Sequence, residues 1–563
     1  MKKSIIRITA IVLSMLFLLS ACGKTNQGGG ATEGEANNSQ SPASPANPAN
    51  PASPANPANP ANPANPAETP GPGITGPVLS DDMLTIAMES EPTSLFPALF
   101  TDSQATDQMI NPCLYDNFAF LNTNTGEVEP RVATSWEWID DYHMRLKIRD
   151  DIYAYGGYRV TAYDIAEAAK YTVEFGVNFT NFNMLDKDKI YAEDDTTLVL
   201  GTLDIYPTLP AMFYAPCWVP IISMEALEAQ GGWDAAFRTP YMNEGRYFVD
   251  EWIEGQYVQL IRNDDYWDQG ALPYYKYLRF VFTPDPTTRA MAVQSGSVDY
   301  AVRISGTQVD ALTAAGITVD PISSAVAFSF FMNTERAPFN DVNFRKAVQM
   351  LIDYDGVIQI GTNGLSERIQ TMFALSNQYY LRNFTGFPND VDINKAKELI
   401  AQTSYNGEKL IISTEPTNAQ TMEYVQACLM AGGINVELQV LESASYRTEM
   451  ASGEYDMNVV PADNSNLARV LNRLDGRVST EISSGGTQYK NDTTYALIDI
   501  ARYTMDDSAR EKALHELQQY IIDNAVMIGL YNTTEIHAHK ADISTKYHLH
   551  MGHPLFWSTT PIS

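Results

Sequence analysis

The sequence predicts an α/β fold with mixed sheets, and three stretches carry this prediction. Residues 247–262 contain two alternating strands around a Glu-Gly turn, which is typical of an antiparallel hairpin. Residues 409–441 read as strand, helix and strand, an order that requires parallel strands. Residues 344–352 place apolar side chains at helical spacing. A chain that combines both kinds of strand pairing with packed helices is expected to form mixed sheets covered by helices.

Length and charge narrow the classes of function. The chain has 563 residues, which corresponds to three or four units of roughly 150 residues or to one large two-lobed protein. Its formal charge is −31. Such an acidic chain argues against nucleic-acid binding and against a basic patch that grips an anionic membrane. The excess of acidic side chains is expected to keep a secreted protein soluble.

The amino terminus predicts export and a lipid anchor. Three basic residues precede an apolar run over residues 8–21, which is too short to span a bilayer. The run ends in Leu-Ser-Ala-Cys at Cys22, which resembles the site at which bacterial lipoprotein signals are cut. We therefore predict a signal peptide over residues 1–21 and a lipid on Cys22. An uncleaved anchor helix is the alternative, and the short apolar run argues against it.

Residues 22–78 are predicted to form the lipidated cysteine and a disordered spacer. From Pro42 to Pro66 every third residue is proline, a spacing that equals the turn of polyproline II. The segment has few apolar side chains to bury, and about 3 Å per residue is expected for a semi-rigid tract of this kind. We expect the spacer to hold the globular part of the chain away from the membrane.

The globular elements begin at Leu79. Residues 84–88 read as a strand that runs into a Pro-containing turn over residues 90–97, and residues 144–150 alternate as a further strand. Thr161 is a predicted helix N-cap, because Asp164 follows at the spacing of a capping box.

Strands and helices alternate after Tyr300. Residues 328–333 are a predicted strand that precedes the helix over residues 344–352. Further helices are expected from Asn394 and from Ser508, and residues 527–531 are a predicted strand.

Several ordered blocks resemble bacterial extracellular solute-binding protein family 5, the receptors that feed peptide and nickel ABC transporters. Residues 262–267 (RNDDYW) are similar to that family's RNPDYW block, and residues 294–299 (QSGSVD) to its QSGEVD block. Gly245-Arg246-Tyr247 stands where the family usually has GPY. Similar blocks follow one another from Leu79 to Tyr531, so the resemblance covers most of the chain.

The resemblance implies a two-lobed periplasmic-binding-protein-like fold with mixed sheets and a hinge between the lobes. Lobe I is expected over residues 79–300 and 529–563, and lobe II over residues 301–528. The implied function is the capture of oligopeptides or similar solutes between the lobes and their delivery to an ABC transporter permease. The receptor is expected to be a monomer on the outer face of the cytoplasmic membrane, with no cofactor and no nucleic-acid partner.

Enzymatic activity is not expected. The sequence has no G-x-S-x-G elbow and no H-E-x-x-H helix, which are the signatures of hydrolases and zinc proteases.

Two alternatives share the fold: a metal-chelate or other non-peptide receptor, and a sensing receptor. His537, His539, His548 and His550 lie in pairs two residues apart, as in a strand that directs both rings to one side. We expect these histidines on surface strands rather than in a metal site, so no metal ligands are assigned.

The resemblance also implies ligand-binding residues. Asp463 best matches the family's carboxylate for the ammonium group of a peptide, with an ordinary turn residue as the alternative, and Asn464 lies beside it. Residues 414–420 contain Asn418 but no arginine where the family's dipeptide receptors bind the carboxylate of their ligand. We therefore expect a ligand that is longer, capped or uncharged at that end. The remaining candidates are Glu91 and Thr93 in the turn over residues 90–97, and Tyr115.

Cysteines and tyrosines give weaker indications of a disulfide and of a ligand cleft. Besides Cys22 the chain has Cys113, Cys217 and Cys428, so at most one disulfide forms and the sequence does not select it. Cys428 lies on the apolar face of a predicted helix and is expected to be a buried thiol. Tyrosine clusters at residues 274–277 and 379–380 are candidates to line a cleft, because their rings combine apolar faces with a polar tip.

Overall fold

The computed structural model describes residues 79–97, 105–121, 128–176, 183–214, 219–233, 242–464, 466–478, 486–548 and 552–562. The chain divides into two compact units, Met1–Pro66 and Ala67–Ser563, and all described residues belong to the second. The predicted signal peptide, Cys22, the spacer, Cys217 and His550 lie outside the described residues. Within the described ranges, no helix has the length and apolar character that a membrane span requires.

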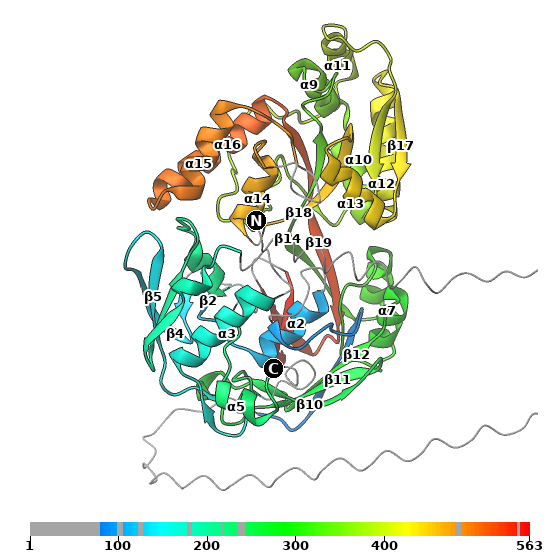
Figure 1. Cartoon of the computed structure of the whole chain (residues 1–563). Helices are drawn as coiled ribbons and strands as arrows, with labels where there is room; N and C mark the ends of the chain where they lie inside the picture. Colours follow the sequence, from blue (N-terminus) through cyan, green and yellow to red (C-terminus); the bar gives the residue numbers. More distant parts are fainter. Residues whose placement is uncertain are drawn as a thin grey trace, which may run out of the picture. The chain divides into compact units, whose positions relative to one another are not determined.

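An eleven-stranded mixed sheet runs through this unit (Figure 1). Ten of the strands follow the order β10-β11-β12-β1-β13-β19-β14-β18-β16-β17, and β15 pairs with β19. Strand β1 lies parallel to β12 and β13, whereas β14 lies antiparallel to β18 and β19. The bounds are β1 Met83–Met88, β10 Tyr247–Ile253, β11 Tyr257–Arg262, β12 Tyr277–Phe282, β13 Tyr300–Ala301, β14 Thr318–Met332, β15 Glu367–Arg368, β16 Leu410–Thr414, β17 Val436–Val440, β18 Met457–Asp463 and β19 Met527–His539.

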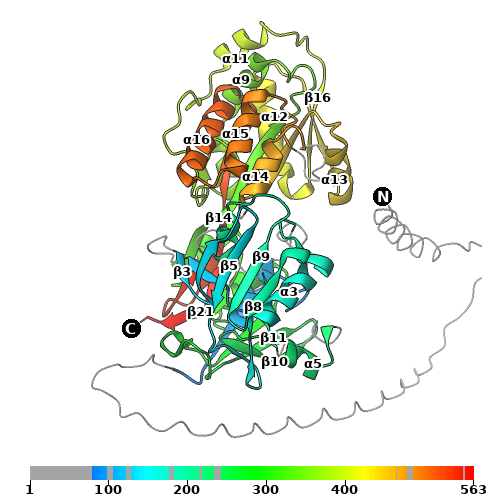
Figure 2. The same cartoon turned by 60° about the vertical axis from the view of Figure 1, so that its left-hand side comes forward.

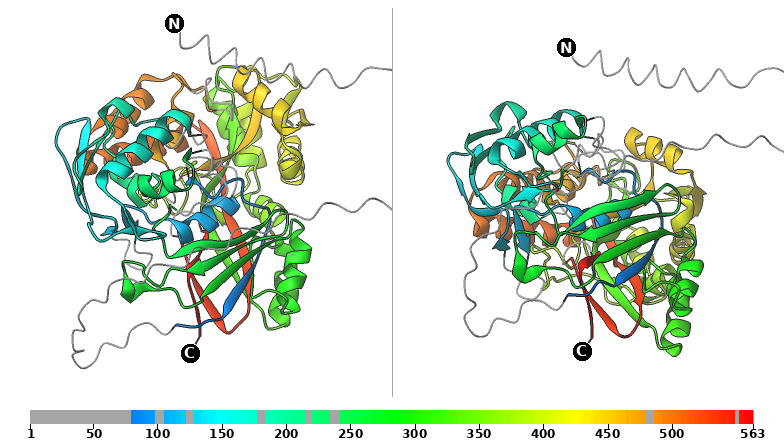
Figure 3. Two further views of the ribbon diagram at one scale, coloured as in Figure 1. Left: turned by 60° about the horizontal axis from the view of Figure 1, so that its bottom comes forward. Right: turned by 90° about the horizontal axis from the view of Figure 1, so that it is seen from below.

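The first lobe surrounds one hydrophobic core, built mainly from residues 84–302 and joined by Ile543 and Phe556. Strands β10 to β12 and β1 lie side by side in Figure 3. Its other elements are α2 Ala105–Leu114, β2 Ala119–Leu121, β3 Val128–Pro130, β4 Ala133–Trp138, β5 His143–Ile148, β6 Tyr153–Ala154, β7 Tyr158–Arg159, α3 Ala162–Phe175, β8 Tyr191–Asp194, β9 Thr197–Gly201, the 3-10 helix η3 Leu209–Tyr214, α5 Met224–Ala229, α7 Pro286–Gln294, β20 Ile543–Tyr547 and β21 Pro554–Pro561.

The hairpin and the capping box predicted for the first lobe are confirmed. Strands β10 and β11 pair in antiparallel register, as the hairpin pattern predicts. Helix α3 begins after Thr161, whose side chain accepts a hydrogen bond from the Asp164 amide while the Asp164 carboxylate accepts from the Thr161 amide at 2.7 Å. The capping box therefore satisfies amides that the first helical turn would otherwise leave unpaired.

In the second lobe, hydrophobic side chains pack against both faces of the sheet. In β14, Phe328 and Phe330 face one core cluster, whereas Ala327 and Phe331 face another, as the alternation of a strand requires. Figure 2 shows α14, α15 and α16 side by side on this lobe. Its helices are α9 Val342–Leu351, α10 Tyr354–Thr362, α11 Ile393–Ile400, α12 Ala419–Ala431, α13 Ser443–Ser452, α14 Leu467–Leu474, α15 Asp492–Tyr503 and α16 Asp507–Asp523. Helix α8 Val309–Ala314 packs instead in a smaller core cluster, in which its Leu312 joins Ala87 of β1 and Val293 of α7.

The β-α-β prediction for residues 409–441 is confirmed. Strands β16 and β17 are parallel and α12 connects them. Helix α9 buries Phe344, Ala347 and Val348, which belong to the predicted apolar stripe. Helix α15 has no counterpart in the sequence-based assignment, which placed a single helix from Ser508 onward.

Two strands are longer than the sequence predicts, and they connect the lobes. Strand β14 begins ten residues before Phe328, and β19 extends from Met527 to His539 rather than to Tyr531. Their antiparallel register shifts between Ser323 and Ala327. A break in the ladder lets a strand pair bend, so we expect the hinge between the lobes at this position.

One expected burial is wrong. Cys428 is only half-buried, because its position on α12 lies at the margin of the buried face formed by Met422, Val425 and Leu429. Cys113 is fully buried in the first core, and burial raises the pKa of its thiol to about 12. Both cysteines are free thiols.

Candidate ligand-binding site

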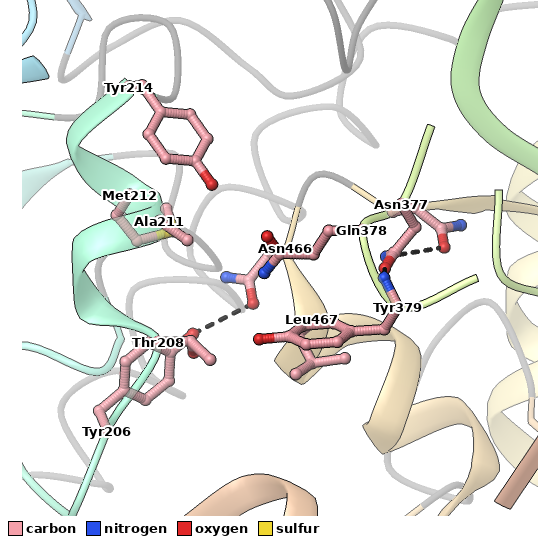
Figure 4. Close-up of a pocket in the computed structure, with 11 residues that line it drawn as sticks. Tyr206, Thr208, Ala211, Met212, Tyr214, Asn377, Gln378, Tyr379, Asn466 and Leu467 are labelled. Atoms are coloured by element: carbon pink, nitrogen blue, oxygen red, sulfur yellow. Dashed lines mark hydrogen bonds between the residues drawn. The ribbon is translucent and has the colours of Figure 1, made fainter. Parts of the chain in front are cut away.

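A pocket lies between the first lobe and the second (Figure 4). The first lobe contributes side chains from η3 and from the loop before it, and the second lobe contributes a loop after β15 and the segment that joins β18 to α14. The lining side chains are predominantly tyrosines and carboxamides: Tyr206, Thr208, Ala211, Met212, Tyr214, Asn377, Gln378, Tyr379, Asn464, Asn466 and Leu467.

A hydrogen bond across the pocket joins the two lobes. The Tyr206 hydroxyl donates to Asn466 Oδ1 at 3.1 Å, and Figure 4 shows this contact. Burial raises the pKa of the Tyr206 and Tyr214 phenols to about 12, so both hydroxyl groups keep their protons at neutral pH. Asn466 also caps α14, because its Oδ1 accepts from the Ala468 amide at 2.8 Å. The position of the contact is therefore set by a helix end rather than by a loop alone.

Asn464 holds the second-lobe wall of the pocket in place. Its Oδ1 accepts from the Ala374 amide at 2.9 Å, and its Nδ2 donates to the Met372 carbonyl at 3.0 Å. These bonds fix the loop that carries Asn377 and Tyr379 into the pocket. Asn464 thus lines the pocket, as the sequence predicts for a ligand-binding residue, but its amide is engaged by the protein's own backbone.

Asp463 points to a different partner from the one expected. Its Oδ2 accepts a hydrogen bond at 2.7 Å from Nη1 of Arg469, which lies in the first turn of α14. A carboxylate that is already paired with a guanidinium offers less to a ligand ammonium than a free one does. Asp463 is not among the residues that line the pocket.

The four remaining candidates are not brought together. Glu91 accepts from Trp252 Nε1 at 2.7 Å and from the Gly255 amide at 3.1 Å, so it attaches its turn to the β10-β11 hairpin. The Thr93 hydroxyl donates to Asp107 Oδ2 at 2.5 Å. Tyr115 is buried in the first core directly after α2, and Asn418 ends a 3-10 turn before α12. None of the four lines the pocket.

Sequence reasoning missed most of the pocket. Tyr379 belongs to one of the tyrosine clusters that are candidates to line a cleft, whereas the sequence gives no indication that Tyr206 or Tyr214 belongs to a pocket. Asn466 stands before an apolar helical stretch, where an asparagine indicates an N-cap. That signal locates a helix start but not the partner across the pocket.

Two of the predicted carboxy-terminal histidines, His537 and His539, are buried rather than exposed on surface strands, and His548 is partly buried. The side chain of His537 is fully buried and His539 is almost so, because β19 lies between two other strands of the sheet. His539 Nε2 lies 3.2 Å from Asp320 Oδ2, and His537 Nε2 lies 3.4 Å from Glu535 Oε2, beside Arg303. Among the described residues, no group of three or more His, Cys, Asp or Glu side chains is arranged to hold a metal ion.

The large sheet with two crossing strands, the separate cores and the pocket between them define a two-lobed solute-binding protein. Residues 127–469 match the family model for the middle region of bacterial extracellular solute-binding proteins, family 5. The chain belongs to this family, which confirms the resemblance and the fold class predicted from the sequence.

Curated relatives cover most of the chain. A probable D,D-dipeptide-binding periplasmic protein of Escherichia coli strain K12 is 23% identical over 467 residues, which cover 80% of this chain and 88% of the relative. The nickel-binding periplasmic protein of the same strain is 25% identical over 409 residues, 67% of this chain and 74% of the relative. These are binding proteins rather than enzymes, in agreement with the prediction for this chain.

Solved structures show the same fold. The ABC transporter-associated periplasmic binding protein DppA from Helicobacter pylori, in complex with peptide STSA, has a TM-score of 0.68 and 23% identity, and the match covers 85% of this chain and 98% of that one. The structure of HbpA2 from Haemophilus parasuis has a TM-score of 0.75 and 18% identity, with 86% and 100% covered.

Proposed function

We propose that this protein is the lipid-anchored receptor of an ABC importer, that it binds oligopeptides in the pocket between its lobes, and that it presents them to the permease. Lobe I would comprise residues 79–300 and 529–563, and lobe II residues 301–528. Cys22 would carry the lipid, which would hold the receptor on the outer face of the cytoplasmic membrane. Family membership and the dipeptide-binding relative support this proposal.

The side chains that line the pocket favour a peptide as the ligand. Carboxamide side chains donate and accept hydrogen bonds, as the backbone of an extended peptide does. Asn377, Gln378 and Asn466 present such groups next to the rings of Tyr206 and Tyr379. Rings and carboxamides together suit a ligand that alternates polar backbone with varied side chains.

The nickel-binding relative makes a metal chelate the second candidate ligand. Native mass spectrometry of the full chain, purified from cells grown in rich medium, separates the two. We expect a ladder of released masses that fit peptides of several lengths. Release of one metal complex, or of one non-peptide mass, would contradict the peptide assignment.

Removal of the hydroxyl that joins the lobes tests the role of the pocket. Tyr206→Phe deletes the bond to Asn466, and a neutral hydrogen bond contributes about 0.5–1.5 kcal/mol. We expect the closed form to be destabilised and the affinity for the ligand to fall by up to roughly tenfold. A smaller fraction of the purified protein should then retain copurified ligand. Tyr163→Phe on α3, at an exposed position, is the matched control and should retain ligand as the wild type does. Equal retention by Tyr206→Phe would place ligand binding elsewhere.

A further inference from the structure

Part of the pocket wall belongs to one loop of the second lobe, residues 374–379, here called the pocket loop. Its last three side chains line the pocket, and Figure 4 shows them opposite η3. The first two amides of the loop donate to asparagine side chains of the large sheet. The Ala374 amide donates to Asn464 Oδ1, at the end of β18, at 2.9 Å. The Leu375 amide donates to Asn532 Oδ1, within β19, also at 2.9 Å.

Asn532 lies directly beside the break in the ladder between the crossing strands. Strands β14 and β19 run from one lobe to the other (Figure 1), and their register leaves residues 324–326 of β14 opposite Thr533 alone. Extra residues of this kind bend the strand that contains them. The side chain of Asn532 is fully buried at this position. The residue that holds the pocket loop therefore lies where we expect the hinge.

The same carboxamide binds the hinge segment, residues 323–326. Asn532 Nδ2 donates to Ser323 Oγ at 2.7 Å and to the Ser324 carbonyl at 2.9 Å. Its Oδ1 accepts from the Leu375 amide, so one planar group holds the hinge segment on one side and the pocket loop on the other. A change in the position of either partner changes the hydrogen bonds of the other.

The pocket loop is held at its two ends by different parts of the second lobe. At the hinge end, the Asn464 amide donates to the Ala325 carbonyl at 2.8 Å, which gives Asn464 the same two attachments as Asn532. At the other end, Gln518 of α16 donates through Nε2 to the Tyr379 carbonyl at 2.7 Å. A movement of the hinge segment therefore displaces one end of the loop relative to the other.

We propose that Asn532 is a positioning residue that transmits the bend of the crossing strands to the pocket loop, so that the pocket changes shape when the lobes close. A bend at residues 323–326 moves the acceptors of Asn532 Nδ2, and the carboxamide carries the Leu375 amide with it. The end of the loop at α16 stays with the second lobe, so the loop changes shape instead of moving as a rigid body. Since the pocket is the proposed ligand site, this role of Asn532 rests on the proposed function.

Coupling of this kind is reciprocal. A hinge conformation that brings the pocket loop into contact with a ligand is itself favoured when that ligand binds. Asn532 is not among the residues that line the pocket, so its effect on affinity comes through the loop.

Hydrogen exchange of the full, ligand-free chain, measured by mass spectrometry, tests the transmission at Ser323. Because Asn532 is fully buried, its own replacement would also affect folding. Ser323→Ala instead removes the nearest acceptor of Asn532 Nδ2, and Ser323 does not line the pocket. We expect the amides of the pocket loop to exchange about two- to tenfold faster, which corresponds to the loss of one neutral hydrogen bond. Ser323→Thr keeps a hydroxyl and should exchange as the wild type does.

Ser329→Ala is the matched control on the same strand. Ser329 is fully buried, and its hydroxyl has no hydrogen-bond partner in the part of the chain that the structure describes. This variant should leave the exchange of the pocket loop unchanged. Strand β16 is the internal reference for Ser323→Ala, because a purely structural role of Ser323 would speed exchange throughout the second lobe. We expect β16 to exchange at the wild-type rate.

Native mass spectrometry of the same proteins, purified from cells grown in rich medium, relates the loop to binding. We expect Ser323→Ala to retain less copurified ligand than the wild type and Ser329→Ala to retain as much. Wild-type exchange of the pocket loop in Ser323→Ala, or equally faster exchange in β16, would overturn the transmission and leave the receptor function intact. Faster exchange of the pocket loop alone with unchanged ligand retention would support the transmission and contradict the assignment of this pocket to the ligand.

Discussion

Arg246→Met is expected to lower the free energy of unfolding by about 3–5 kcal/mol, because it leaves a buried carboxylate without its main partner. The Arg246 guanidinium donates to Asp116 Oδ1 at 2.8 Å, and both side chains are at most 5% exposed. Tyr266 and Trp267 donate to Asp116 Oδ2 at 2.5 and 2.8 Å. Burial alone would raise the pKa of Asp116, but Arg246, Arg131 and these two donors together hold it below its usual value. Chemical denaturation at neutral pH measures the loss.

Arg149→Met is the matched control for this substitution. Arg149 stacks on the Trp267 ring, with its Cζ 4.1 Å from the ring centroid, much as Arg246 stacks on the Trp557 ring, but the ion-pair partner of Arg149, Asp151, is half-exposed. Exposed ion pairs contribute about 0–1 kcal/mol, so the control should lose no more than that. A loss of less than about 1 kcal/mol for Arg246→Met would show that Arg131 alone compensates the Asp116 charge.

Asp107→Asn is expected to stabilise the protein above pH 6 by up to about 3 kcal/mol, since each unit of pKa shift corresponds to about 1.4 kcal/mol. Burial raises the pKa of Asp107 from 3.8 to about 6, although hydrogen bonds from Thr93 and Ser94 oppose the shift. The folded state therefore binds more protons than the unfolded state between about pH 4 and pH 6, and stability falls as the pH rises through this window. The asparagine has no charge to bury, and it keeps an acceptor for the Thr93 amide, which lies 2.8 Å from Oδ1 in the wild type.

Unfolding curves from pH 4 to pH 8 measure this difference. The wild type and Asp107→Asn should be closest in stability near pH 4 and diverge up to about pH 6, above which the difference is constant. Asp285→Asn is a control of opposite sign, because hydrogen bonds from Thr288 lower the pKa of that exposed helix cap. A wild type and Asp107→Asn that differ by the same amount at every pH would contradict the assignment of this titration to Asp107.

The family motifs over residues 245–267 make contacts within the first lobe, and none of their residues lines the pocket. Asn263 of the RNDDYW block donates through Nδ2 to the Gly245 carbonyl at 3.0 Å, and Tyr266 and Trp267 of the same block bind Asp116. Gly245 also lets its backbone lie close to that of Leu114: its amide donates to the Leu114 carbonyl at 2.9 Å, and a Cβ on residue 245 would lie 2.2 Å from that oxygen. The recurrence of these residues in the family therefore identifies the fold but does not locate the ligand.

The sequence by itself determined the fold class, the hairpin, the capping box at Thr161 and the parallel β16-α12-β17 unit. Each depends on periodicity or on residues a few positions apart, which a linear pattern records directly. The family was identified from many blocks that occur in the same order as in its members, so the identification did not depend on any single block.

Only the tertiary structure decided which side chains meet. Tyr206 and Asn466 are 260 residues apart, and Asp116 reaches Arg246 across 130. Neither pair has a local signature, because their contacts depend on how strands from distant parts of the chain pair and on where helices end. The same reason explains why Asp463, the positional match to the family's ligand carboxylate, is paired with Arg469.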